Sequence, residues 1–304
     1  MKKIELPMIK FRFELEALEE IPFPVFRGSA FRGAFGRALM ETVEHRVYQE
    51  IFESHSTFEN CRNNEGRTIP NPYFFDAADY SGTVQAGGLF DIGLALFGTR
   101  MRYVEHAVNA VVYAAEHGFS VDRGRARVNR IFQVMSDGSE ELLYDGRHVI
   151  VKSQLDKHFV VFYPEQINCV EIDFITPTRL LCSNELPDLQ KFTPGLLFSH
   201  LIGRIRQLFN LYSHYRFPVD YSDDDYQEYI RNISVYDNRL RIFECARYSS
   251  RQDRIINLDG FSGRVVLTGR GLDYLAPYLA AGEYLRVGHA AVMGLGQYRL
   301  NYLF

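Results

Sequence analysis

The sequence is short of cysteine and has no long apolar run. Its four cysteines, Cys61, Cys169, Cys182 and Cys245, are widely separated, with no C-x-x-C pair and no Cys/His cluster at ligand spacing. This pattern fits neither a disulfide framework nor a zinc site, so we expect no structural metal and no cofactor. No apolar run is long enough to span a bilayer, and the N-terminus enters an alternating strand pattern without a signal-peptide core. We therefore expect a cytoplasmic protein with no membrane partner.

Excess positive charge is also absent, because the formal net charge is −4. This balance argues against a general electrostatic binder of nucleic acid. The basic residues are nevertheless strongly biased, since six of the 34 are lysine and 28 are arginine. Arginine carries a planar donor fork that suits phosphates and base edges, so the bias favours RNA or DNA recognition. An organism with an arginine-rich composition would show the same ratio.

The order of predicted elements is repeated in the two halves of the chain. The first half predicts a strand at 9–17, a helix from Ser29 as N-cap to about 51, a strand within 87–98, a helix at 102–117 and strands at 128–135 and 140–144. The second predicts a strand at 170–175, a helix from Thr193 as N-cap to about 215, a solvated acidic loop at 222–225, strands at 239–248 and 262–268, a helix at 272–283 and a strand at 297–303. At 304 residues the chain is long enough for two domains. We expect an α+β fold of two tandem ferredoxin-like domains, at 1–150 and 151–304.

A glycine-rich loop at 288–296 separates the last predicted helix from the last strand. Its glycines and the basic residues in and around it are Gly288, Gly294, Gly296, Arg286, His289 and Arg299. Glycine adopts positive φ, and successive free N–H groups in such a turn form an anion site, so a phosphate backbone is the expected partner. The loop matches neither the dinucleotide fingerprint nor the P-loop. A tight helix-to-strand connection would use the same glycines.

The first predicted helix carries a polar stripe, because Arg37, Glu41 and His45 are four residues apart. A carboxylate one turn from a histidine raises the imidazole pKa, which suits proton transfer near neutral pH. An ordinary solvated helix face has the same spacing. In the same helix Gly33 and Gly36 each cost about 1 kcal/mol relative to alanine, so we expect a close backbone contact there.

Five stretches, in order, carry a family resemblance. They are 26–34 (Phe26-Arg27-Gly28-Ser29-Ala30-Phe31-Arg32-Gly33-Ala34), Asn71-Pro72-Tyr73, 87–98, 173–180 and 288–296. Together they resemble the CRISPR-associated endoribonucleases that process precursor guide RNA, members of the RAMP superfamily. The resemblance implies RAMP-type (RRM-like) tandem domains with a basic cleft and metal-independent cleavage of CRISPR repeat RNA. Many relatives carry several cysteines between the first helix and the Pro-Tyr segment, where this chain has only Cys61, so we expect no metal there.

The resemblance also implies a mechanism, in which the RNA 2′-hydroxyl attacks the adjacent phosphate and leaves a 2′,3′-cyclic phosphate and a 5′-hydroxyl. The family's catalytic histidine often lies on or just after the first helix. By that analogy His45 is the first catalytic candidate, His289 the second and His55 the third, with Tyr48 as an assisting group. The predicted RNA contacts are Arg27, Arg32, Arg37, Arg286, Gly288, Gly294, Gly296 and Arg299, although each arginine could instead form a structural ion pair.

Two other functions stay open. One is a non-catalytic RAMP subunit that binds repeat RNA within a CRISPR ribonucleoprotein, because a phosphate pocket and a catalytic pocket use the same residue types. The other is a protein-interaction module, since fold alone does not fix function. The expected partners are CRISPR repeat RNA, as precursor or mature guide RNA, and other Cas proteins of an effector or adaptation complex.

Overall fold

Two compact units make up the described chain. The computed structural model describes residues 1–24, 26–54, 69–76, 82–120, 122–149, 155–183, 185–249 and 254–303. The N-terminal unit comprises Pro7–Phe159 and Asn210–His214, and the C-terminal unit comprises Met1–Leu6, Val160–Phe209 and Tyr215–Phe304. The boundary predicted between residues 150 and 151 stays a prediction.

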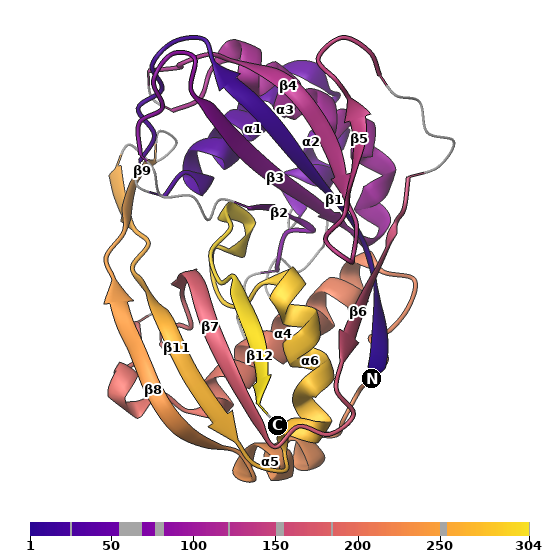
Figure 1. Ribbon diagram of the computed structural model, residues 1–304, viewed down its shortest axis with the longest axis vertical. Helices are drawn as coiled ribbons and strands as arrows, with labels where there is room; N and C mark the ends of the chain where they lie inside the picture. Colours follow the sequence, from indigo (N-terminus) through magenta and orange to yellow (C-terminus); the bar gives the residue numbers. More distant parts are fainter. Residues whose placement is uncertain are drawn as a thin grey trace. The chain divides into compact units, whose positions relative to one another are not determined.

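The N-terminal unit has the strand order of a ferredoxin-like fold. Its elements are β1 (Lys2–Ala17), α1 (Gly28–Thr42), α2 (His45–Ile51), β2 (Tyr73–Asp76), β3 (Leu89–Phe97), the 3-10 helix η2 (Gly98–Tyr103), α3 (Val104–His117), β4 (Ala126–Val134) and β5 (Glu140–Tyr144). The sheet has the order β2-β3-β1-β4-β5, and β6 (His158–Tyr163) also pairs with β1. The helices α1 and α3 cover one face of this sheet (Figure 1).

The alternating pattern of β1 produces the two faces of this sheet. Phe11, Phe13 and Leu15 are each at most 1% exposed, whereas the charged residues between them point to the other face. An aromatic cluster fills the space between sheet and helices, where the ring of Phe31 lies 5.4 Å from that of Phe23 and 5.8 Å from that of Phe119. Burial of several phenylalanines in one cluster supplies much of the apolar driving force for this unit.

The C-terminal unit repeats the same topology. Its elements are β7 (Cys169–Thr178), the 3-10 helix η3 (Leu189–Lys191), α4 (Pro194–Tyr212), α5 (Asp223–Arg231), β8 (Ser234–Phe243), β9 (Ala246–Ser249), β10 (Arg254–Asn257), β11 (Gly260–Thr268), α6 (Leu272–Leu285), the 3-10 helix η4 (Ala291–Met293) and β12 (Tyr298–Leu303). The main sheet has the order β12-β7-β11-β8, and β9 and β10 form a separate hairpin. The predicted α+β fold of two tandem ferredoxin-like domains is confirmed.

One glycine brings α4, α6 and β12 together. A Cβ atom on Gly282 of α6 would lie 2.2 Å from Leu201 of α4 and 2.4 Å from the hydroxyl of Tyr298 on β12. The two helices therefore pack against each other and against the same face of the sheet, which leaves the opposite face to solvent (Figure 1). Within the described residues, no helix is long and apolar enough to cross a membrane.

The first predicted helix is in fact two helices. The prediction of one helix from an N-cap at Ser29 to about residue 51 was wrong, because α1 begins at Gly28 and ends at Thr42. Val43 is extended, with φ −130° and ψ 161°, and α2 then begins at His45. The break removes the one-turn spacing between Glu41 and His45, so the predicted stripe does not hold at its last residue.

The predicted close contact at Gly33 and Gly36 is a side-chain contact, and only at Gly36. A Cβ on Gly36 would lie 2.5 Å from the ring of Phe52, which follows α2. At Gly33 the nearest atom is 3.8 Å away, an ordinary van der Waals distance. The glycine at 36 thus lets the chain after α2 fold back onto α1.

Three further differences concern the C-terminal half. The predicted acidic loop at 222–225 is the start of α5, where the Ser222 side chain accepts a hydrogen bond from Asp225 N–H and caps the helix. Acidic residues in a first turn also stabilise a helix through their interaction with the positive end of its dipole. The strand β6 was not predicted, and the strand predicted at 239–248 is divided between β8 and β9. By contrast, Thr193 caps α4 as predicted, because its hydroxyl accepts the Leu196 N–H at 3.3 Å.

Candidate functional site

The glycine-rich loop is tied to the end of β7. Gly288, Gly294 and Gly296 have φ values of 81°, 92° and 76°, in the left-handed region that favours glycine. A Cβ on Gly296 would lie only 1.8 Å from the carbonyl oxygen of Val287. The loop is closed by Val287 N–H donating to Gly296 O at 3.0 Å and by Gly296 N–H donating to Pro177 O at 3.1 Å. The chain therefore requires glycine at this loop for its backbone shape.

About half of the loop's N–H groups are used inside the protein. The N–H groups of His289 and Gly294 donate to Arg179 O and Ala291 O, each at 2.9 Å. Within the described residues, five others have no protein acceptor: those of Gly288, Ala290, Ala291, Val292 and Leu295. These five N–H groups are compatible with the predicted anion site. The other N–H groups of the loop hold its backbone in place.

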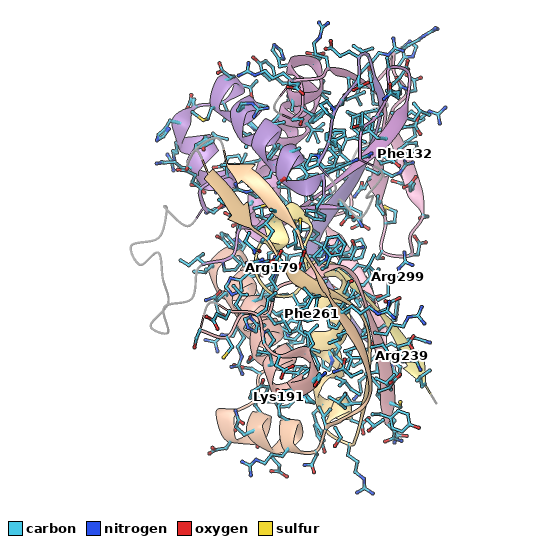
Figure 2. The ribbon with its side chains drawn as sticks, turned by 90° about the vertical axis from the view of Figure 1, so that its left-hand side faces the viewer. Phe132, Arg179, Lys191, Arg239, Phe261 and Arg299 are labelled. Atoms are coloured by element: carbon cyan, nitrogen blue, oxygen red, sulfur yellow. The ribbon has the colours of Figure 1, made fainter. Side chains whose placement is uncertain are left out.

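The two arginines that flank the loop lie in different environments. Arg286, the residue after α6, is 2% exposed and has φ 69°, and burial lowers the pKa of its guanidinium. Arg299, on β12, is exposed (Figure 2 labels Arg299 and Arg239). Its register partner is Asp173, which pairs in turn with Arg264, and Arg264 pairs with Arg239. Of the two, only Arg299 is accessible to a ligand.

His289 lies beside a second histidine and an arginine that the sequence did not single out. Its ring centroid is 5.7 Å from that of His200 on α4, with the rings at 68°. The ring nitrogen Nε2 of His200 lies 3.1 Å from the carbonyl oxygen of Leu181. Desolvation and the nearby charge of Arg179 lower the pKa of His289, so its imidazole is neutral at neutral pH and can accept a proton. Residues 179, 200 and 289 are too far apart in sequence for any spacing rule to join them.

The N-terminal candidates form a different group. His45 is exposed at the first residue of α2, and its ring centroid lies 6.2 Å from that of Tyr48, with an angle of 21° between the rings. The Tyr48 hydroxyl donates to Glu53 at 3.4 Å, and its ring stacks on Phe52 at 5.4 Å. The third candidate, His55, lies outside the described residues. The structure thus brings His45 and Tyr48 together on α2.

The three N-terminal arginines differ in accessibility. Arg27 is 2% exposed, donates to Gly82 O at 2.9 Å and lies over the ring of Phe23. Its side chain therefore contacts the protein interior and is not exposed to a ligand. Arg32 is half-buried, with its guanidinium 4.4 Å above the ring of Phe52. Arg37 is exposed and donates to Gly118 O at 3.3 Å. Arg37 is therefore the most accessible of the three to RNA.

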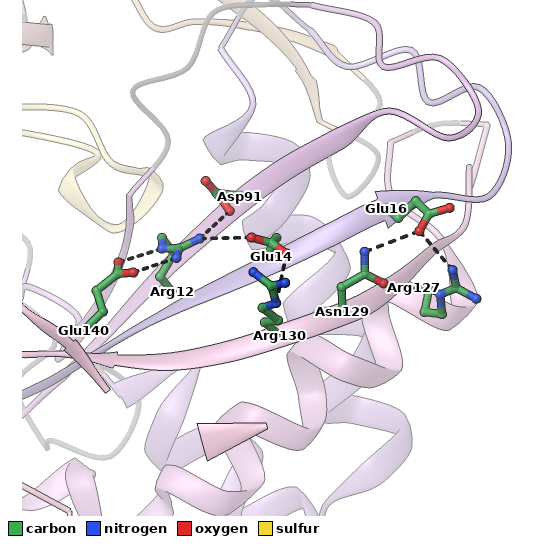
Figure 3. Close-up of polar contacts among 8 residues, drawn as sticks. All are labelled: Arg12, Glu14, Glu16, Asp91, Arg127, Asn129, Arg130 and Glu140. Atoms are coloured by element: carbon green, nitrogen blue, oxygen red, sulfur yellow. Dashed lines mark hydrogen bonds and ion pairs between the residues drawn. The ribbon is translucent and has the colours of Figure 1, made fainter. Parts of the chain in front are cut away.

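The solvent face of the N-terminal sheet is covered by paired charges (Figure 3). Arg12 forms two hydrogen bonds of 2.6 Å with Glu140 and one of 3.0 Å with Asp91. Arg127 donates to Glu16 at 2.9 Å. A cavity of about 240 Å³ on this unit is lined by Lys10, Phe11, Arg12, Arg27, Phe31, Asp76, Asp91, Gly93, Val134 and Glu140. Its cations face carboxylates, so it does not favour an anionic ligand.

No metal site is apparent in the part of the chain that the structure describes. In those residues there is no group of three or more His, Cys, Asp or Glu side chains placed to hold an ion. Cys169, Cys182 and Cys245 are free thiols, and burial raises the pKa of Cys169 and Cys245. Cys61 lies outside the described residues.

Comparison with known proteins gives two family matches that together cover most of the chain. Residues 6–156 match the AF_1859_N family, described as an N-terminal domain, and residues 172–298 match the CRISPR-associated endoribonuclease Cas6. The second match includes the glycine-rich loop. An uncharacterised protein of Archaeoglobus fulgidus is 22% identical over 289 residues, covering 91% of this chain and 92% of the relative.

Solved structures share the fold. The Thermus thermophilus Cas6 (TTHB231) product complex has a TM-score of 0.59 at 15% identity, covering 97% of this chain and 99% of that one. A partial Cas6-RT-Cas1–Cas2 complex has a TM-score of 0.59 at 14% identity, covering 98% of this chain and 47% of that one. At such identities the structural likeness concerns the fold.

The tandem ferredoxin-like fold is shared with solved Cas6 structures. The match of residues 172–298 assigns this part of the chain to the CRISPR-associated endoribonuclease Cas6 family.

Proposed function

We propose that this chain is a metal-independent endoribonuclease that cleaves CRISPR repeat RNA by attack of a 2′-hydroxyl on the adjacent phosphate. The observation that carries the proposal is the match of residues 172–298 to the Cas6 endoribonuclease family, which spans the glycine-rich loop and His289. The tandem fold shared with a Cas6 product complex supports it. The products would be a 2′,3′-cyclic phosphate and a 5′-hydroxyl.

The chemistry asks little of the protein besides alignment and proton transfer. RNA supplies its own nucleophile, so the enzyme must bring the 2′-oxygen, the phosphorus and the 5′-oxygen into line and stabilise charge on the phosphate. One group removes the proton of the 2′-hydroxyl, and one donates a proton to the leaving 5′-oxygen. Histidine side chains suit both transfers, and arginines or loop N–H groups suit the phosphate charge.

His45 is the proposed catalytic histidine, with His289 as the second candidate. His45 is exposed at the start of α2, where an RNA strand can reach its ring, and Tyr48 stacks beside it and would orient it. His289 has a lowered pKa, which suits a proton acceptor. For RNA contacts we propose Arg32, Arg37, Arg299 and the loop at 288–296, and we leave out Arg27 and Arg286 because both are buried.

Replacement of the two histidines tests this assignment. We expect His45→Ala to lower the single-turnover cleavage rate by about 10²–10⁴, the usual range for loss of a general acid or base. Affinity for the repeat RNA should stay within about twofold, because binding is spread over many phosphate contacts. His106→Ala, an exposed histidine on α3, is the matched control and should cleave normally. Normal cleavage by His45→Ala together with loss in His289→Ala would transfer the role to His289.

Other Cas proteins are proposed partners. A structure with the same fold is part of a Cas6-RT-Cas1–Cas2 complex, which supports association of this chain with Cas proteins of an adaptation complex. Co-purification of this chain with the Cas proteins of its own locus would test the proposal. The alternative of a non-catalytic subunit predicts tight binding of repeat RNA without cleavage.

A further inference from the structure

Three nitrogen-rich side chains from separate segments meet at the glycine-rich loop. Arg179 follows β7, His200 lies on α4 and His289 lies in the loop. The backbone N–H of His289 donates to the Arg179 carbonyl oxygen at 2.9 Å, and the two imidazole centroids are 5.7 Å apart. A Cβ on Gly288 would lie 2.6 Å from the same Arg179 oxygen. The backbones of the loop and of the segment after β7 are therefore held in direct contact.

The side chains of Arg179 and His200 each contact a backbone carbonyl oxygen. The Arg179 guanidinium donates to the carbonyl oxygen of Asp259 (Figure 2 labels Arg179). The carbonyl oxygen of Leu181 can only accept, so the Nε2 of His200 that faces it carries a proton. These two contacts orient the side chains, and a carbonyl oxygen carries no formal charge to neutralise that of Arg179.

Arg179 and His289 are two basic groups in a partly desolvated position. Among the described residues, neither Arg179 nor His289 forms an ion pair. The other titratable groups that act on Arg179 are Asp259 and Cys245, which raise its pKa, but burial outweighs them and lowers it. The same desolvation, helped by the Arg179 charge, lowers the pKa of His289. A phosphate here would add negative charge beside the imidazole of His289 and favour its protonation.

We propose that Arg179, His200 and His289 form a phosphate site for the repeat RNA, in which Arg179 and His289 contact the phosphate and His200 positions the His289 ring. This site rests on the proposed function, because the phosphate is that of the bound RNA. The phosphate site goes beyond the proposed function because it adds Arg179 and His200 and couples RNA binding to the uptake of a proton. A single pKa unit of difference between the free and bound states changes affinity tenfold.

The test is the pH dependence of RNA affinity. The probe is repeat RNA with a 2′-deoxy nucleotide at the cut site, so that binding is measured without cleavage. We expect the wild-type protein to bind about tenfold more tightly at about pH 6 than at about pH 8, where the imidazole is neutral. His289→Asn should lose most of this ratio while keeping its affinity at high pH. Arg179→Gln should weaken binding at both pH values, because arginine is charged at both.

His200 is tested by the midpoint of the same profile. His200→Gln keeps an N–H donor for the Leu181 oxygen but removes the imidazole beside His289. We expect the midpoint of the pH profile to shift while affinity at high pH stays within about twofold, a change that loss of packing alone would not give. His106→Asn should reproduce the wild-type profile. An unchanged midpoint in His200→Gln would overturn the role given to His200.

Failure of the site and failure of the proposed function give different results. If the RNA affinity of His289→Asn depends on pH in the same way as that of the wild-type protein, the phosphate site is overturned and the proposed function stays intact. Absence of salt-sensitive binding of repeat RNA by the wild-type protein at either pH would contradict the proposed function, and the site with it.

Discussion

Single glycines determine the backbone path around the candidate site. At Gly296 two demands coincide, because φ is 76° and the neighbouring Val287 oxygen leaves no room for a Cβ. At Gly138, in the turn before β5, φ is 82° but no atom lies within 4 Å of the position that a Cβ would take. Comparison of Gly296 with Gly138 therefore separates the cost of a positive φ from the cost of steric overlap.

We predict that Gly296→Ala lowers the free energy of unfolding by about 2 kcal/mol or more, because the cost of alanine at a positive φ and the cost of overlap with Val287 add. Gly138→Ala should cost about 1 kcal/mol, from the backbone conformation alone. Urea unfolding of both variants measures the difference. Equal losses would mean that the loop shifts to accept the methyl group.

A charged pair on the N-terminal sheet gives a pH-dependent prediction. The hydrogen bonds from Arg12 lower the pKa of Glu140, so the pair stabilises the folded state above the ordinary glutamate range and loses this effect as the pH falls through the lowered value. Glu140→Gln should therefore reduce stability by about 1 kcal/mol at neutral pH and by less near pH 3, about one unit below the ordinary pKa. Unfolding measured at both pH values tests it, with the exposed Glu244→Gln as control. A loss of equal size at both would contradict the assignment to ionised Glu140.

At the scale of elements, the break between α1 and α2 depends on a ring packed against a glycine. Phe52 follows α2 and its ring occupies the position that a Cβ on Gly36 would need. The same ring lies under the Arg32 guanidinium at 4.4 Å and 6.0 Å from the ring of Tyr73. The fold-back of the chain onto α1 thus places α2, which carries His45 and Tyr48.

We predict opposite effects for two glycines of α1. Gly36→Ala should destabilise by about 1–3 kcal/mol, because the methyl group overlaps the Phe52 ring. Gly33→Ala, whose Cβ would make an ordinary contact of 3.8 Å with Arg37, should be neutral or stabilising by up to about 1 kcal/mol. In a Phe52→Leu background the cost of Gly36→Ala should fall, since the two positions are coupled through contact. Additive losses would show that Phe52 does not cause the cost.

Periodicity in the sequence predicted elements with one buried face, and glycines predicted turns and helix ends. The alternation in β1 and the Asp137-Gly138 turn before β5 are confirmed, as is Gly118 at the end of α3. The break after Thr42 could not be predicted, because no proline or glycine marks it and its cause is the distant packing of Phe52 on Gly36. The helix α5 was missed because its acidic start resembles a solvated loop until Ser222 is recognised as a cap.

At the scale of the whole molecule, part of the candidate site was accessible to sequence reasoning and part was not. The glycine-rich loop was, because three glycines near two arginines and a histidine stand out in any sequence. Burial of Arg27 and Arg286, by contrast, depends on tertiary packing. Arg179 and His200 join His289 only through the topology that brings β7, α4 and the loop together, so no local pattern could have indicated them.

The central proposal is that this chain cleaves repeat RNA without a metal, using the RNA's own hydroxyl. The most direct measurement is cleavage of labelled repeat RNA from its own locus in EDTA, with and without a 2′-deoxy nucleotide at the cut site. The account predicts one cleavage position in EDTA, a 2′,3′-cyclic phosphate product and no cleavage of the deoxy substrate. Cleavage that needs a divalent ion, or that continues on the deoxy substrate, would contradict it.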